Sequence, residues 1–456
     1  MEHLQTTEKV HDELLLHRRV DLLLRTGKLL VESLADTNRV VRNMKRTAAF
    51  LEEKLHINVS FTMLMVNVSD GDYSFTKFQR IEGHGVNMTA ISAVSKLSWR
   101  AIENDYTLDQ YEEELEEIRK RKRNYTPWQV AVGAGFACGG FCIQFGCDWV
   151  AFLYASIAAI IGMRVRAKCN ESGLNHYMGI AIAAFISTML AWASTLLPAS
   201  WTTTPWHPLL ACALFIVPGV PLINFVDDML DNYIQVGIVR AVNTLLMVSA
   251  MAFGIAFAVK ICHIENFFPT ISMVPHHNYI EYAIAAAISA MGFSMIFNIP
   301  RRLLWVVAIG GIIAVCTRNF VNLGPSTDNI GLDMGLVIGS FASSVLVSLI
   351  AIKAVHWFHC PNHVLTIPSV IPMIPGVLMY RMLFGIINMN VESPEQISIL
   401  MKAIQSGITS GMVILCISLG VAIPNIFGRK YIAKEKNKRL KEILAERRAR
   451  GKFVEW

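Results

Sequence analysis

The chain has 456 residues, of which 53% are hydrophobic and 17% are charged, with a net charge of +6 and a mean hydropathy of +0.43. Soluble domains average about 25% charged residues, so the composition excludes a wholly soluble protein and indicates a membrane protein with a soluble part. The Lys and Arg residues flank the apolar segments, as they do on the cytoplasmic side of membrane proteins, and therefore give no indication of nucleic-acid binding.

Residues 1–126 hold most of the acidic residues and predict a small α+β cytoplasmic domain. Apolar residues recur at helical spacing over 10–55, with a division at Gly27 or at 35–38. Two strands are predicted next, at Asn58–Val68 and Tyr73–Arg80, joined by a hairpin turn at 69–72. Two helices are predicted after them, at 87–104 and at 108–123, the second with Thr107 as its N-cap. No phosphate-binding glycine loop and no nucleophile elbow is present in the sequence, so we expect a protein that is not an enzyme and needs no cofactor.

Ten apolar segments of roughly 20 residues predict an α-helical integral membrane protein. The predicted spans are 128–147, 149–165, 176–197, 208–226, 238–259, 280–298, 303–317, 333–355, 365–387 and 404–426. Basic residues precede the first span and follow the second, sixth and tenth, whereas the loop at 198–207 carries none. This distribution predicts a multi-pass protein of the cytoplasmic (inner) membrane with both termini cytoplasmic.

A Pro-Gly pair occurs inside two of these spans, in FIVPGVPLI at 215–223 and in PMIPGVLMY at 372–380. Proline removes a backbone donor and glycine relaxes φ, so each pair predicts a broken helix. Two broken helices at matching positions of two halves are typical of the binding site of a secondary transporter.

Other landmarks recur in the same order, which predicts two inverted repeats of five helices each. Gly140-Phe141 matches Gly292-Phe293, and Trp149 matches Trp305. Five spans in each half force the second half to insert upside down. We therefore expect four parts: a cytoplasmic domain at 1–126, a first repeat at 127–262, a second repeat at 278–427, and a basic cytoplasmic tail at 428–456.

The candidate substrate-binding residues lie at the two breaks or on adjoining spans. They are Pro218, Gly219, Asn224, Asn243, Pro375, Gly376, Tyr380, Ser406 and Ser410. A half-helix that begins at a break can hold a carboxylate at its N-terminus, although a Pro-Gly pair can equally be a structural kink. The polar side chains either bind the amine, hydroxyl or carboxylate of a substrate or form hydrogen bonds between helices.

Two acidic residues, Asp227 and Asp228, follow the first break and are candidates for carrying a coupling proton; a solvated loop is the alternative. The loop at 356–363 contains His356, His359, Cys360 and His363. These are zinc-ligand residue types, but Pro361 interrupts the run and we expect no metal.

Several segments resemble the threonine/serine exporter family over nearly the whole chain. The resemblance rests on Gly27–Leu30 with Ala35–Val40, Gly85–Asn87, TLDQYEEELEEI at 107–118, DWVAFL at 148–153, Val217–Gly219 and VDDMLDNYIQVGIVRA at 226–241. It implies a cytoplasmic domain, ten spans and proton-driven export of threonine and serine, or of small dicarboxylates such as succinate in relatives whose halves are separate chains. Leu34 stands where the family often has Gly.

The leading hypothesis is thus a secondary exporter of a small amino acid, with protons and the lipid bilayer as its other partners. The alternatives are an exporter of dicarboxylates and a passive channel for a small solute. Uphill efflux that an uncoupler abolishes would exclude the channel. The oligomeric state does not follow from the sequence.

Overall fold

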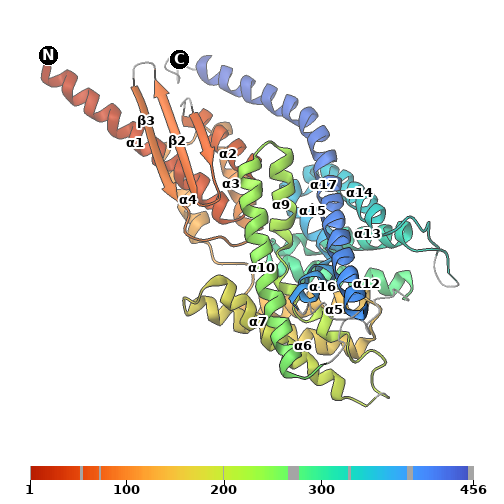
Figure 1. Ribbon diagram of the computed structural model, residues 1–456. Coiled ribbons are helices and arrows are strands. Elements are labelled where there is room, and N and C mark those ends of the chain that lie inside the picture. Colours follow the sequence, from red (N-terminus) through yellow and green to blue (C-terminus); the bar gives the residue numbers. More distant parts are fainter. Residues whose placement is uncertain are drawn as a thin grey trace. The chain divides into compact units, whose positions relative to one another are not determined.

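The computed structural model describes residues 2–51, 55–70, 73–198, 200–264, 277–326, 330–387 and 394–449 (Figure 1). The chain forms two compact units. The first comprises Met1–Lys122, Asp228–Gly237 and Asn425–Trp456, and the second comprises Arg123–Asp227 and Ile238–Pro424. A short segment that follows the first Pro-Gly break therefore belongs to the same unit as the N-terminal residues.

The described residues of the N-terminal part of the first unit form four helices and an antiparallel sheet in the order β1-β2-β3, which lies alongside α1 in Figure 1. Its elements are α1 Glu2–Glu32, α2 Thr37–Leu51, β1 Leu55–Val59, β2 Met63–Asp70, β3 Tyr73–Arg80, α3 Met88–Glu103 and α4 Leu108–Lys120. The predicted hairpin is confirmed by the Asp70–Tyr73 pairing. The predicted helices at 87–104 and 108–123 are also confirmed, and Thr107 caps α4 in a capping box.

The prediction of one strand over Asn58–Val68 is wrong, because the chain turns between β1 and β2. Ser60 forms this turn: its N–H donates to the Met63 carbonyl (2.8 Å) and its Oγ accepts from the Met63 N–H (2.9 Å). Gly27 does not divide α1 and α2; it lies inside α1, where a Cβ would meet Met44 and Leu64. The division comes at Leu34, whose φ of 60° is the left-handed conformation that favours glycine.

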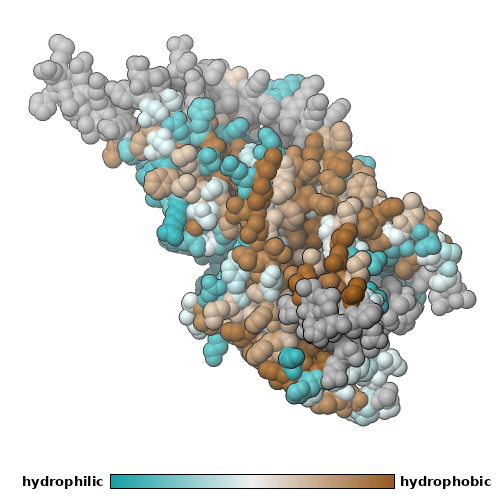
Figure 2. Space-filling view, in the orientation of Figure 1, coloured by the Kyte–Doolittle hydropathy of each residue, from teal (hydrophilic) through white to brown (hydrophobic). Residues whose placement is uncertain are grey.

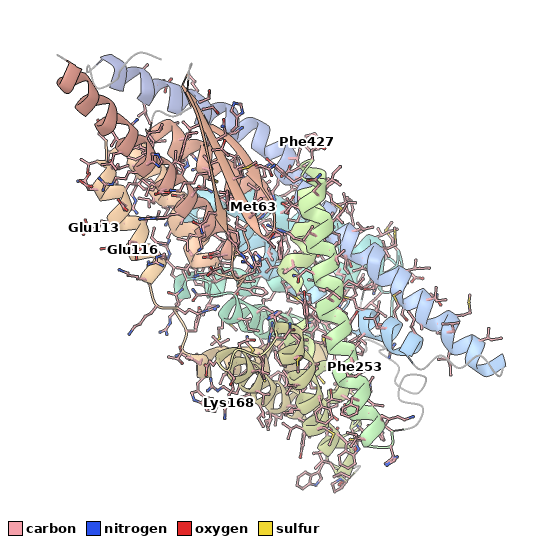
Figure 3. All side chains as sticks on the ribbon, turned by 60° about the vertical axis from the view of Figure 1, so that its left-hand side comes forward. Met63, Glu113, Glu116, Lys168, Phe253 and Phe427 are labelled. Atoms are coloured by element: carbon pink, nitrogen blue, oxygen red, sulfur yellow. The ribbon has the colours of Figure 1, made fainter. Side chains whose placement is uncertain are left out.

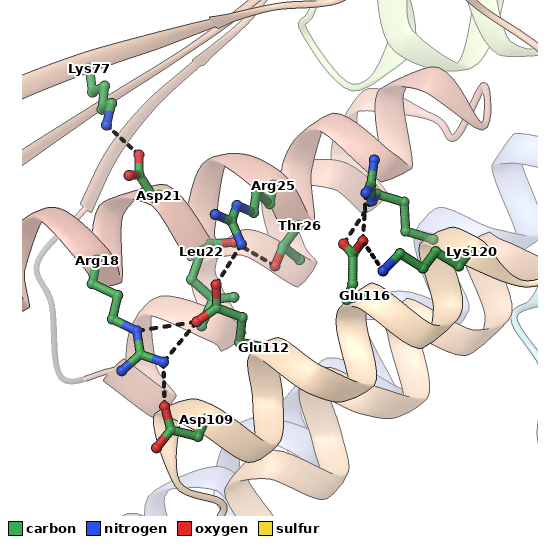
Figure 4. A network of polar contacts seen from close by, with 11 residues as sticks. Arg18, Asp21, Leu22, Arg25, Thr26, Lys77, Asp109, Glu112, Glu116 and Lys120 are labelled. Atoms are coloured by element: carbon green, nitrogen blue, oxygen red, sulfur yellow. Dashed lines mark hydrogen bonds and ion pairs between the residues drawn. The ribbon is translucent and has the colours of Figure 1, made fainter.

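Ion pairs between α1 and α4 (Figure 4), together with one buried tyrosine, connect α4 to the other helices of this unit. Arg18 pairs with Asp109 and Glu112, and Arg25 lies 2.5 Å from Glu112. Tyr111 is fully buried and shares hydrogen bonds with hydroxyls of α1 and α2, while burial raises its pKa. The N-terminal segment is therefore a packed α+β unit.

The second unit is built from helices and short 3₁₀ turns. They are α5 Pro127–Gln144, α6 Trp149–Glu171, α7 His176–Trp192, η1 Ala193–Leu196, α8 Pro208–Ala211, η2 Leu214–Ile216, α9 Gly219–Leu230, α10 Ile234–Ile261, α12 Tyr279–Ile296, η3 Arg301–Leu303, α13 Leu304–Asn322, α14 Leu336–Phe358, α15 Asn362–Val370, η4 Ile371–Met373, α16 Gly376–Ile387 and α17 Pro394–Ala449. The last residues of α9, the first of α10 and the end of α17 belong to the first unit.

Seven helices among the described residues are long and apolar enough to cross a membrane, or up to nine spans if each of two bent helix pairs counts as one. The predicted span that is not among these helices is the first, 128–147, which corresponds to α5, an 18-residue helix rich in Gly, Ala and Cys that is largely buried. Large apolar side chains point outward from the long helices: Phe253 on α10 is 61% exposed, and brown residues cover the visible face of α10 (Figures 2 and 3). Such faces suit contact with lipid.

Helices α5 and α12 cross closely at the centre of the second unit, and their contacts are reciprocal. A Cβ added to Gly140 would lie 2.6 Å from the Ala285 oxygen and 2.8 Å from Ser289 Cβ. One added to Gly292 would meet the Gly133 oxygen and lie 2.6 Å from the Ala137 nitrogen. Ala285, Ser289 and Gly292 of α12 each lie 152 positions after Gly133, Ala137 and Gly140 of α5, so each helix presents the same pattern of positions to the other.

Candidate functional site

Each Pro-Gly pair bends the chain between a 3₁₀ turn and a half-helix. The axes of Pro208–Ile216 and Gly219–Leu230 differ by 58°, and those of Asn362–Met373 and Gly376–Leu383 differ by 56°. The same tight hydrogen bond closes both bends, from Gly219 N–H to the Val217 carbonyl (2.8 Å) and from Gly376 N–H to the Ile374 carbonyl (2.9 Å). The predicted helix breaks are therefore present in the structure.

The two breaks lie against each other, and these contacts are also reciprocal. A Cβ on Gly219 would meet Ile371 Cδ1 and lie 2.9 Å from Ile374 Cδ1. A Cβ on Gly376 would lie 2.7 Å from Leu214 Cδ2 and 3.0 Å from Val217 Cγ2. Each glycine thus faces the 3₁₀ turn that precedes the other break, and the absence of a side chain on each permits the close approach.

The N-termini of α9 and α16 start at these two glycines. The first turn of a helix has N–H groups without partners inside the helix, and the helix dipole adds partial positive charge there. The Gly219 and Gly376 N–H groups already donate within the bends, and Pro221 has no N–H. The other N–H groups of the two first turns, together with the helix dipoles, favour an anionic group such as a carboxylate.

The two halves differ at the backbone position three residues before the Pro-Gly pair, Phe215 in the first half and Pro372 in the second. The Phe215 N–H donates to Cys138 Sγ (3.2 Å), and the Cys138 thiol lies 3.8 Å from the Cys212 carbonyl, all buried. At the corresponding positions of the second half, Pro372 has no N–H and the side chain of Ala290 has no polar atom. Cys138 could not be singled out from the sequence, because Cys in an apolar helix usually packs as a small hydrophobe.

We expect Cys138→Ala to lower the stability of the protein by about 1–3 kcal/mol, the cost of a buried donor that loses its acceptor. Cys138→Ser keeps an acceptor and should cost less. The measurement is thermal unfolding of the purified protein in detergent, with Cys416→Ala on α17 as the control, since no hydrogen bond of the Cys416 thiol is among those described. Equal stability of the Ala and Ser variants would contradict this account.

Tyr380 connects α16 to the first break. Its hydroxyl donates to the Leu210 carbonyl at the end of α8 (2.7 Å), and the side chain is buried. Ser343 makes a comparable contact in the second half: its Oγ lies 2.7 Å from the Ala314 carbonyl and 2.9 Å from Met373 Sδ. Side-chain hydroxyls thus support both breaks, and the Tyr380 proton is engaged within the protein.

Of the other predicted binding residues, Asn224 follows a break closely in the chain, whereas Asn243, Ser406 and Ser410 lie on α10 and α17. Asn224 is buried in α9, one turn after the first break. Asn243 on α10 accepts a hydrogen bond from the Tyr177 hydroxyl (2.7 Å), an interhelical contact. Ser406 and Ser410 lie on α17, where the half-buried Ser406 donates to the Lys402 carbonyl of its own helix (2.8 Å) and Ser410 is buried.

The two acidic candidates have different surroundings. Asp227 Oδ2 lies 3.7 Å from His363 Nε2 on α15, and both side chains are buried. Asp228 Oδ1 accepts a hydrogen bond from the Thr37 N–H (2.8 Å). Among the described side chains, His359 and Cys360 do not join His363 in a group close enough to hold a metal ion; the His356 side chain lies outside them. The sequence drew attention to His363 only as a metal ligand, not as a partner of Asp227.

Comparisons with known proteins agree with this architecture. Residues 21–262 match the family model described as "Putative threonine/serine exporter", and residues 282–427 match the one described as "Threonine/Serine exporter, ThrE". The chain is 25% identical over 199 residues (44% of this chain, 76% of the relative) to the "Probable succinate transporter subunit YjjP" of Klebsiella aerogenes. It is 25% identical over 202 residues (44% and 77%) to the protein of the same name from Escherichia coli.

No solved structure matches the chain. The first family model alone covers more than half of the chain, and the second covers most of the remaining helices. The resemblance noted in the sequence is therefore confirmed: this is a multi-pass membrane protein of a transporter family, not of an enzyme family, and the chain belongs to the threonine/serine exporters.

Proposed function

We propose that the protein is a proton-coupled secondary transporter that exports threonine and serine across the cytoplasmic membrane. The observation that carries this proposal is the pair of Pro-Gly breaks, which meet so that two half-helices begin in contacting segments. The N-termini suit the substrate carboxylate. Membership of the threonine/serine exporter family supports the choice of substrate.

We further propose that residues 127–262 and 278–427 are inverted repeats, with ten spans when α5 is counted. The reciprocal contacts of α5 with α12, and of the two breaks, support a pseudo-two-fold axis. An axis in the membrane plane would let the two halves rock around a fixed site, giving alternating access. Residues 1–126 and the basic segment 428–456 are then both cytoplasmic.

We propose a substrate site centred on the breaks. Pro218, Gly219, Pro375 and Gly376 shape its backbone, and Asn224 and Tyr380 supply polar groups next to it. Asn243, Ser406 and Ser410 are the more distant candidates and would contact substrate only in another conformation of the transport cycle.

Topology gives a direct prediction. With both termini in the cytoplasm, a cysteine introduced at Thr203 in the loop 198–207 should react with a membrane-impermeant maleimide added outside intact cells. A cysteine at Arg121 should react only after the cells are opened. Labelling of the 198–207 loop from the cytoplasm alone would rule out this arrangement of ten spans.

We assign the coupling proton to Asp227 rather than to Asp228, because Asp227 is buried beside His363, whereas Asp228 receives a backbone N–H. Asp227→Asn removes the titrating carboxylate but keeps the shape of the side chain. We expect this variant to lose uphill export driven by a proton gradient, at least tenfold, while retaining exchange of labelled for unlabelled threonine. Uphill export at the wild-type rate would exclude Asp227 as the proton carrier.

The decisive experiment for the function is transport of radiolabelled threonine, serine and succinate by the purified protein in proteoliposomes, with and without an imposed proton gradient. Accumulation of threonine and serine that an uncoupler abolishes is expected. Accumulation of succinate alone would favour the dicarboxylate alternative, which the names of the two relatives suggest. Movement unaffected by the gradient would indicate a channel.

A further inference from the structure

The carboxylate of Asp228 lies at the N-terminus of α2. The Thr37 N–H donates to Asp228 Oδ1 (2.8 Å), and both residues are buried. One residue further along α2, the Asn38 amide donates to Asp231 Oδ2 (2.7 Å). All four residues belong to the first unit, although Asp228 and Asp231 follow the first break in the chain.

The start of α2 supplies donors that need acceptors. Asp36, the residue just before α2, accepts from the Arg39 N–H (2.8 Å) and from Arg39 Nε (2.9 Å), so its carboxylate is the acceptor for the third residue of the helix. The Thr37 N–H, at the first position, is left for another acceptor, because the first four N–H groups of a helix have no partners within it. Asp228 provides that acceptor from a segment 191 positions away.

The position of Asp228 on its own helix does not explain its burial. Asp228 lies in the last turn of α9, where the helix dipole disfavours a negative charge. At the N-terminus of α2 the dipole favours it. The position that corresponds to Asp228 in the second half is Gly385 on α16, so the second half has no equivalent carboxylate.

Helix α9 runs without interruption from Gly219 at the break to Leu230. Its 12 residues span about 18 Å at 1.5 Å per residue. We infer that Asp228 and Asp231 form a latch, through which the start of α2 fixes the far end of the half-helix that begins at the first break. Asp228 is then a positioning residue, and the N-terminal unit sets the transport rate through it.

This inference rests on the proposed role of the break in transport, and two substitutions of Asp228 test it. Asp228→Asn keeps an oxygen acceptor for the Thr37 N–H, so we expect threonine export within about twofold of wild type and with the same dependence on the proton gradient. Asp228→Ala removes the acceptor, and we expect a loss of about tenfold. A gradient-independent Asp228→Asn variant would overturn the latch, because it would make Asp228 a proton carrier.

The second pair of residues permits an exchange experiment. Asn38→Asp places a carboxylate opposite Asp231, and the repulsion should open the latch, slow export several-fold and speed hydrogen exchange of the amides at 37–40. Adding Asp231→Asn places the amide at 231 and the carboxylate at 38, so that the hydrogen bond can form again in the opposite direction. The export rate and the hydrogen exchange at 37–40 should then both return toward wild type. Asn58→Asp on the exposed part of β1 is the matched control.

The two readouts separate the possible failures. If the wild-type protein transports none of the tested substrates but the exchanged pair restores protection of α2, the proposed function is wrong and the latch remains as a structural contact. If the wild type transports threonine and the exchanged pair restores neither rate nor protection, the latch is wrong.

Discussion

Gly219→Leu and Gly376→Leu are each expected to abolish threonine export while leaving the protein folded and inserted. The atoms that a new side chain would meet at these positions are the ends of Ile371, Ile374 and Leu214. Flexible side chains can move aside, so the fold should survive, but they would fill the place where the two half-helices meet. A loss of at least a hundredfold in initial efflux of labelled threonine, at matched membrane levels, is the expected result.

Gly411→Leu is the matched control for this experiment, because it also lies in an apolar helix but a Cβ there would meet nothing within 4 Å. Ile371→Ala in the Gly219→Ala background provides a second check, since it returns the space that the added methyl group takes. Normal efflux in both leucine variants would move the substrate site away from the breaks. Loss of insertion in both would leave only a structural role for the glycines.

Gly292→Val is expected to have the opposite pattern, with loss of the folded protein rather than of transport alone. The groups it would meet are backbone atoms, the Gly133 oxygen and the Ala137 nitrogen of α5. Backbone in the middle of a helix cannot rotate away, so α5 and α12 would have to separate. Overpacking in a core costs about 1–3 kcal/mol, and more where the neighbours cannot adjust.

The measurement is thermal stability by size-exclusion chromatography in detergent. Gly140→Val should behave in the same way, because a Cβ there would meet the Ala285 oxygen. Gly411→Val should remain at the wild-type stability. A stable, transport-deficient Gly292→Val protein would mean that the crossing is less tightly packed than the structure indicates.

Local patterns were sufficient to predict the long helices, the capped helix after Thr107 and the two breaks. Pro-Gly in an apolar segment has few structural outcomes, which is why 218–219 and 375–376 were predictable from the sequence. The turn after Ser60 was missed because it contains neither Gly nor Pro and is closed by a serine hydroxyl. The residues of such a turn do not predict it, because they lack the Gly and Pro that usually indicate turns.

Contacts between distant segments account for what the sequence could not reveal. Asp228 in an acidic run is typical of a solvated loop, and only the fold brings it to the Thr37 N–H. In the same way, His363 was noticed for its neighbours in the chain, whereas its partner Asp227 comes from the other half. Periodicity reports which face of a helix is buried but not which helix covers it.

The different chemistry at the two breaks determines which parts of the chain can be exchanged. The Phe215 N–H depends on a sulfur atom of α5, while Pro372 removes the need for any acceptor. A chimera that grafts 208–219 without α5 would carry a donor into a place that offers only Ala290. The smallest segment that can be exchanged between such proteins is therefore the first helix of a half together with its break. Chimeras whose junction lies between α5 and η2 should rarely be functional.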